Sequence, residues 1–99
     1  MREETVEKYL REQVEKVGGM CVKTEARGVP VGWPDRLVLL RNGKTLYVEV
    51  KKPKGWVVQA AQSGIHQRLR KMGMTVYTVF SKGDADRMLE RELKNGTSE

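Results

Sequence analysis

The stretch Trp33–Pro53, WPDRLVLLRNGKTLYVEVKKP, forms the centre of the predicted sheet. It predicts two strands around an Asn-Gly turn, a dipeptide typical of β-hairpins. Both strands are apolar on both faces, so we expect helices to cover the sheet on both sides. Yet Asp35 opens the hairpin, and Glu49 and Lys51 close it. An exposed edge strand is the alternative explanation, but charges at the ends of otherwise apolar strands favour a functional site.

The flanking sequence predicts the other elements. Val6, Leu10, Val14 and Val17 recur at helical spacing, and a Gly-Gly pair ends that helix. The predicted order is α-β-β-β-α-β-α, with helices at 2–17, about 57–72 and 81–94 and strands at 20–26, 35–41, 44–51 and 74–80. We therefore expect one α/β domain over residues 1–94, with a mixed central sheet flanked by helices, and a flexible tail at 95–99.

Composition narrows the classes of function. The 99 residues suit one domain, and 19 Lys and Arg against 13 Asp and Glu give a net charge of +6. A basic surface favours polyanions such as nucleic acid or an acidic membrane face. The lone Cys21 permits no internal disulfide and no cysteine-based zinc site. With no signal peptide and no apolar run of roughly 20 residues, we expect a cytoplasmic protein without a membrane span.

The length of the turn decides whether the two carboxylates meet. Side chains alternate along a strand, so Glu49 and Lys51 share one face. A two-residue loop would pair Asp35 with Val50 and turn its carboxylate away from Glu49. A three-residue loop, Arg41–Gly43, would set Asp35 opposite Glu49. We expect the odd-length loop or a bulge.

Two close carboxylates repel each other unless a cation lies between them. A hard divalent ion with oxygen ligands, Mg²⁺ or Mn²⁺, resolves that repulsion. Lys51 beside the ion can orient a water, lower its pKa or stabilise charge that builds up on phosphorus. These features indicate a metal-dependent phosphodiesterase, and the basic composition points to nucleic acid as its substrate.

A family resemblance begins at these residues. Pro34-Asp35, thirteen intervening residues and Glu49-Val50-Lys51 resemble the PD-(D/E)xK nuclease signature. The wider context resembles the stand-alone, minimal type of the virus-type replication-repair nuclease domain, VRR-NUC. It comprises Glu3, Val6, Glu7 and Leu10 in the first helix, RGVPVGWPDRLVLL, GKTLYVEVKKP, and then Gln62, His66, Leu69 and Gly73.

The resemblance implies roles for several residues. Asp35, Glu49, the backbone carbonyl of Val50 and Glu3 would bind Mg²⁺ or Mn²⁺, Lys51 would be the catalytic lysine, and Gln62 would line the site. Glu7 is the alternative to Glu3 as the helical acid, and the sequence leaves that choice open.

Other polar and aromatic residues are weaker candidates. We interpret His66 as a packed histidine rather than a catalytic one, while Trp33 and Trp56 suit packing or DNA stacking equally well. Met72 and Met74 suit core burial better than a pairing surface. The predicted phosphate contacts are Arg27, Arg36, Lys52, Lys54, Arg68, Arg70 and Lys71.

From these residues and the resemblance together, we predict a Mg²⁺- or Mn²⁺-dependent, structure-specific DNA endonuclease. The resemblance implies a Holliday-junction resolvase-like homodimer that leaves 5′-phosphates, in a prokaryotic or phage-infected host cell. The alternatives are a flap or restriction-type DNA endonuclease and a non-catalytic nucleic-acid-binding module. The sequence leaves open the preferred DNA structure, the dimer interface and the metal used in the cell.

Overall fold

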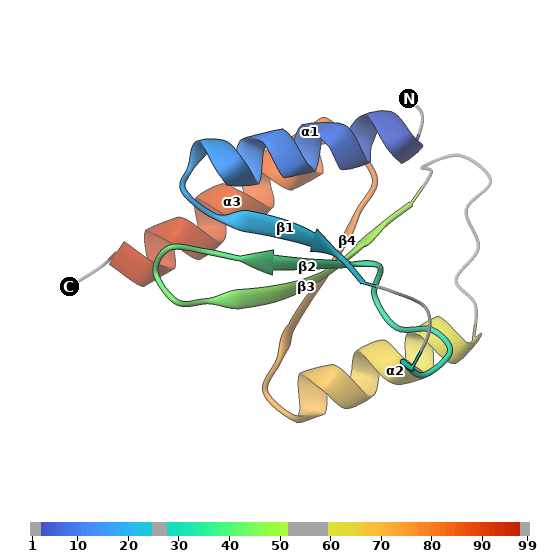
Figure 1. The fold of residues 1–99 in the computed structure, drawn as a ribbon. Helices are drawn as coiled ribbons and strands as arrows, with labels where there is room; N and C mark the ends of the chain where they lie inside the picture. The colour runs from blue at the N-terminus through green and yellow to red at the C-terminus, as the bar shows by residue number, and fades with distance from the viewer. Residues whose placement is uncertain (1–2, 25–27, 52–59, 98–99) are drawn as a thin grey trace.

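The computed structural model describes residues 3–24, 28–51 and 60–97 and confirms the predicted order of elements (Figure 1). The elements are α1 (Glu3–Lys16), β1 (Met20–Lys23), β2 (Arg36–Leu39), β3 (Thr45–Val50), α2 (Ala60–Lys71), β4 (Thr75–Val79) and α3 (Lys82–Thr97). None of the described helices combines the length and apolar character that crossing a bilayer requires.

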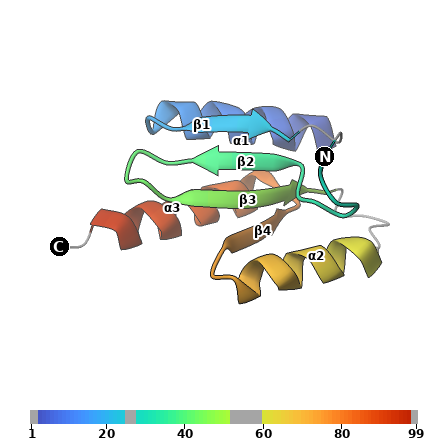
Figure 2. The same cartoon turned by 60° about the horizontal axis from the view of Figure 1, so that its bottom comes forward.

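The four strands form one mixed sheet in the order β1-β2-β3-β4 (Figure 2). β1, β2 and β3 pair antiparallel, whereas β3 and β4 pair parallel. Parallel neighbours need a long crossover, and α2 lies within the segment that makes it. As a result, the ends of β3 and β4 lie at the same end of the sheet.

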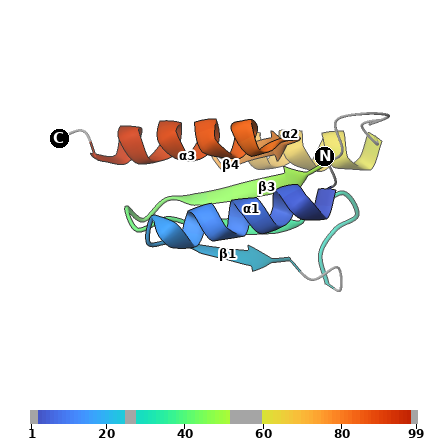
Figure 3. The ribbon, with the colours of Figure 1, turned by 90° about the horizontal axis from the view of Figure 1, so that it is seen from above.

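Helices cover both faces of the sheet, as the apolar hairpin predicts. Figures 1 and 3 show α1 and α3 together on one face and α2 on the other. The main core lies under α1 and α3, where Val6, Leu10 and Val14 pack with Val48 and Val50 of β3. Burying each such side chain contributes about 1.5–3 kcal/mol relative to leaving it exposed. This core fixes β3, and with it the face on which Glu49 lies.

The hairpin loop has three residues, as predicted. The N–H of Leu40 donates to the carbonyl of Lys44, and the N–H of Gly43 donates to the carbonyl of Leu40, each at 2.9 Å. Gly43 has a φ of +87°, the left-handed conformation that this loop type needs. The observed register pairs Arg36 with Val48, and one further step sets Asp35 opposite Glu49.

The last helix extends beyond its predicted end. We expected it to stop at residue 94, yet α3 continues to Thr97. Helix propensity is a weak guide at a terminus, because an established helix can carry one further turn through poor helix formers such as Asn and Gly. At its start, the N–H of Asp84 donates to Ser81 Oγ at 3.1 Å, so Ser81 is the N-cap.

Two methionines are not where we expected them. Met72 is 64% exposed and Met74 is 42% exposed, so the expectation of core burial is wrong for both. They lie in the short connection between α2 and β4, where Gly73 has a φ of +93°. A tight turn that reverses the chain leaves its side chains little room to reach the core.

Candidate active site

Asp35 and Glu49 are held together by reciprocal backbone contacts. The N–H of Asp35 donates to Glu49 Oε1 at 3.2 Å, and the N–H of Val50 donates to Asp35 Oδ1 at 3.2 Å. Each carboxylate is therefore oriented by an amide of the opposite strand. The two contacts hold the carboxylates close together between the start of β2 and the end of β3.

Lys51 completes the cluster at the end of β3. Its Nζ lies 3.1 Å from Glu49 Oε2, and its backbone N–H donates to the carbonyl of Val79 at 3.0 Å. The side chain of Glu49 is 6% exposed, that of Lys51 is 22% exposed and that of Asp35 is 36% exposed. The site is therefore graded from a buried carboxylate to one open to solvent, with an ammonium group beside them.

Helix α1 contacts the cluster through Glu7, which forms an ion pair with Arg36 of β2. Arg36 Nε lies 3.2 Å from Glu7 Oε2, and Arg36 Nη1 lies 3.8 Å from Asp35 Oδ2. Arg36 Nη1 also donates to the carbonyl of Asp35 at 2.9 Å, and its side chain is only 13% exposed. Glu7 also forms an ion pair with Arg11 at 3.4 Å. The guanidinium that we expected to contact phosphate is thus already held by protein groups.

His66 approaches the same region from α2. It is 8% exposed, in keeping with a packed histidine, and its buried Nε2 has no hydrogen-bond partner in the described part of the chain. Burial lowers its pKa, and the nearby charges of Arg70 and Lys51 lower it further, while Glu49 opposes them. The imidazole is therefore neutral near pH 7. The sequence contained no signal for an unpaired nitrogen here, because only the packing of α2 creates it.

The loop before Asp35 adds an aromatic wall. Trp33 packs edge-to-face on Tyr47, with ring centroids 5.8 Å apart and planes at 86°. This contact assigns Trp33 a packing role, one of the two uses we considered. Beside it, residues 29–35 and Thr24 line a hollow of about 270 Å³ that opens next to Asp35.

The other predicted site residues divide into three groups. Glu3 and Gln62 belong to α1 and α2, whose first turns lie at the same end of the sheet as the end of β3 (Figures 1 to 3); the structure does not describe their side chains. Arg27, Lys52, Lys54 and Trp56 lie outside the described residues. Arg68, Arg70 and Lys71 are exposed in the last turn of α2.

The donor set fits a hard divalent cation. Asp35 and Glu49 supply carboxylate oxygens and Val50 a carbonyl, the ligand types that Mg²⁺ and Mn²⁺ prefer. Within residues 3–24, 28–51 and 60–97, no three His, Cys, Asp or Glu side chains gather as a metal-binding group. The two described carboxylates therefore suit an ion such as Mg²⁺, which usually keeps several waters and uses one or two protein carboxylates.

A mixed sheet with two carboxylates and a lysine at its rim defines an α/β domain of the nuclease type. No protein-family model matches the chain. It is 40% identical over 82 residues to a protein named "Putative nuclease p44" of Acyrthosiphon pisum secondary endosymbiont phage 1, covering 83% of this chain and 86% of that protein. A solved VRR_NUC domain is 38% identical, with a TM-score of 0.80, covering 89% of this chain and 94% of the other. The chain belongs to the VRR-NUC family, which confirms the resemblance noted in the sequence.

Proposed function

We propose that the protein is a Mg²⁺- or Mn²⁺-dependent DNA endonuclease that acts as a homodimer on branched DNA, with four-way junctions as its preferred substrate. The observation that carries this proposal is the convergence of Asp35, Glu49 and Lys51 from two strands. Membership of a family of nuclease domains and the net charge of +6 also support it.

The proposed ligands of the cation are Asp35, Glu49, the carbonyl of Val50 and Glu3. We choose Glu3 over Glu7 because the carboxylate of Glu7 already forms ion pairs with two arginines. When bound, the cation supplies Lewis-acid polarisation of the phosphate and a more acidic water. The burial of Glu49 keeps one ligand rigid, while the more exposed Asp35 stays accessible from solvent, as contact with a DNA phosphate requires.

Lys51 is the proposed catalytic lysine. It is partly exposed, and its ammonium group has three N–H donors. The contact with Glu49 does not use all of them, so donors remain for the reaction. Those donors orient the attacking water and stabilise negative charge on a phosphate oxygen as the transition state forms. Water adds to phosphorus as the bond to the 3′ oxygen breaks, which leaves a 3′-hydroxyl and a 5′-phosphate.

A homodimer suits this chemistry because a four-way junction is itself nearly symmetric. A two-fold axis places two identical sites so that each nicks one of two strands. The similarity to a phage protein supports a role in the cytoplasm of a prokaryotic or phage-infected cell.

The test compares cleavage of a labelled four-way junction, a flap and a plain duplex in Mg²⁺. We expect the wild type to cleave the junction fastest, and Lys51→Ala and Glu49→Gln to lose at least about 10²-fold in rate. Lys16→Ala, an exposed lysine at the far end of α1, is the matched control and should cleave normally. Preference for the flap or duplex would replace the junction assignment. DNA binding without cleavage, unaffected by EDTA, would show a binding module instead.

A further inference from the structure

Strand β4 forms an open edge of the sheet with a groove along it. Within the described chain, β4 pairs only with β3, so its other side has no strand partner. Two hollows of about 370 Å³ and 430 Å³ flank this edge and share Tyr77 and Arg91 in their walls. Arg87 lines the first and Arg70 lines the second. We call the surface formed by Arg70, Tyr77, Arg87 and Arg91 the β4 groove.

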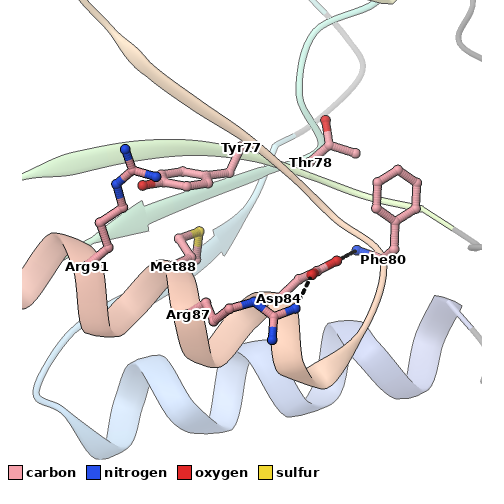
Figure 4. Close-up of a pocket in the computed structure, with 7 residues that line it drawn as sticks. All are labelled: Tyr77, Thr78, Phe80, Asp84, Arg87, Met88 and Arg91. Carbon is pink, nitrogen blue, oxygen red and sulfur yellow. Dashed lines mark hydrogen bonds and ion pairs between the residues drawn. The ribbon is translucent and has the colours of Figure 1, made fainter.

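The arginines of the groove come from both flanking helices. Arg87 and Arg91 lie one turn apart on α3, and Figure 4 shows Arg91 alongside the ring of Tyr77. Arg70 comes from α2, and its Nη2 donates to the carbonyl of Val76 at 3.0 Å. Three guanidinium groups thus follow one strand edge.

The carboxylates in the same walls already have cationic or hydrogen-bonding partners. Asp84 accepts from the N–H of Phe80 at 2.9 Å and from Arg87 Nη2 at 2.7 Å. Glu92 accepts from Lys44 Nζ at 3.3 Å and from the hydroxyl of Tyr77. These contacts reduce the acidic character of the groove (Figure 4 shows those of Asp84).

Two of the arginines keep donors for a ligand. Arg91 is exposed, and none of the ion pairs among the described residues includes it. Arg87 contacts Asp84 through a single nitrogen, and a guanidinium has five N–H donors in a planar fork that suits phosphate. The groove therefore presents unsatisfied positive charge.

Charge also argues against a second copy of the chain at this edge. An antiparallel pair of two β4 strands related by a two-fold axis would bring the arginines of both copies along one seam. Bringing these helix-borne arginines of two copies together would oppose like charges, and basic residues near a sheet edge are a common protection against pairing there. A polyanion is the complementary occupant.

The groove leads toward the candidate active site. Lys51 is hydrogen-bonded through its backbone to Val79, and the next residue, Phe80, lines the first hollow. The five residues of β4 span about 16 Å at roughly 3.3 Å per residue, which matches the rise of about five base pairs at roughly 3.4 Å each. One stretch of DNA can therefore reach both the groove and the catalytic lysine.

We propose that the β4 groove binds the sugar-phosphate backbone of DNA beside the scissile bond, with Arg87 and Arg91 as phosphate ligands and Arg70 adding positive charge to its wall. The inference rests on the proposed function, because it takes DNA as the substrate. It adds Arg87 and Arg91, which lie outside the phosphate-contact set expected from the sequence.

The test measures DNA binding by fluorescence anisotropy in EDTA, over a range of salt concentrations, for Arg91→Ser and the double variant Arg87→Ser/Arg91→Ser. The slope of log K against log[salt] is negative, and each lost phosphate contact should make it less steep by about 0.9. The slope of the double variant should therefore be shallower by about 1.8. Lys16→Ser removes one charge from an exposed position on α1 and should keep the wild-type slope. Circular dichroism verifies that each variant is folded.

An unchanged slope in the double variant would overturn the proposal. A change in oligomeric state on sedimentation, with DNA binding intact, would overturn it in favour of a protein contact. Cleavage by the same preparations in Mg²⁺ separates this inference from the proposed function. If the wild type cleaves and the slope is unchanged, only the groove assignment fails; if the slope becomes shallower but nothing cleaves, only the nuclease assignment fails.

Discussion

Replacing Lys51 with Gln should separate metal binding from catalysis. Without a metal, the ammonium of Lys51 compensates the buried carboxylate of Glu49 across 3.1 Å. A divalent ion at Glu49 must compete with that ion pair and is then repelled by the nearby ammonium. Lys51→Gln removes both effects but keeps a side chain of similar length. We expect the variant to bind Mn²⁺ more tightly while losing cleavage.

The magnitude follows from the distance and the exposure of Lys51. Two unit charges about 4 Å apart interact by about 1 kcal/mol in water, and a divalent ion doubles this. Lys51 is only 22% exposed, so this water value is a lower limit on the repulsion that the ion feels. A gain of about 1–2 kcal/mol corresponds to roughly five- to thirtyfold tighter Mn²⁺ binding. The cleavage rate should fall by at least about 10²-fold, because the variant lacks the ammonium group that stabilises negative charge on the phosphate in the transition state.

Isothermal titration with Mn²⁺ alone measures the affinity, and junction cleavage measures the rate. Lys16→Gln is the control for a simple loss of one positive charge, and Glu49→Gln should lose both binding and cleavage. If Lys51→Gln bound Mn²⁺ more weakly than the wild type did, Lys51 would not oppose the ion at Glu49. The arrangement of charges described here would then be wrong.

Three further predictions concern the scaffold. Leu10→Ala, at a fully buried position, should lower the free energy of unfolding in urea by about 2–5 kcal/mol, and a loss under 1 kcal/mol would show that this core contact is unimportant. Gly43→Ala should cost about 1 kcal/mol through its φ of +87° alone, because a Cβ there meets no atom within 4 Å; unchanged stability would exclude the strained loop. Because the folded pKa of His66 lies below its ordinary value of 6.5, the unfolded chain binds the proton first, and stability should fall as pH drops below about 6.5. His66→Gln in metal-free buffer should show a shallower fall, whereas an identical pH profile would contradict this assignment.

The sequence predicted the hairpin and its register because both depend on local rules. Strand alternation has a period of two, and the glycine at 43 permits the left-handed conformation that a three-residue loop needs. They allowed two loop lengths, and the three-residue loop that we expected is the one that sets Asp35 opposite Glu49. The buried face of α1, with Val6, Leu10 and Val14, likewise followed from the helical spacing of its apolar residues.

Contacts between distant elements were not predictable in this way. The ion pair of Arg36 with Glu7 depends on how α1 packs against β2, and no local pattern encodes it. The buried nitrogen of His66 and the exposure of Met72 depend on where α2 and its following turn come to lie. The β4 groove was missed for the same reason, because its arginines come from two helices that the sequence separates.

In the proposed site, Asp35 and Glu49 bind one cation at the rim of the sheet and Lys51 stands beside it. Anomalous diffraction from a crystal soaked in Mn²⁺ tests it most directly. We expect a manganese peak within coordination distance of both carboxylates, with Lys51 beside it but not bound to it. A manganese ion bound elsewhere, with both carboxylates still held only by protein groups, would contradict it.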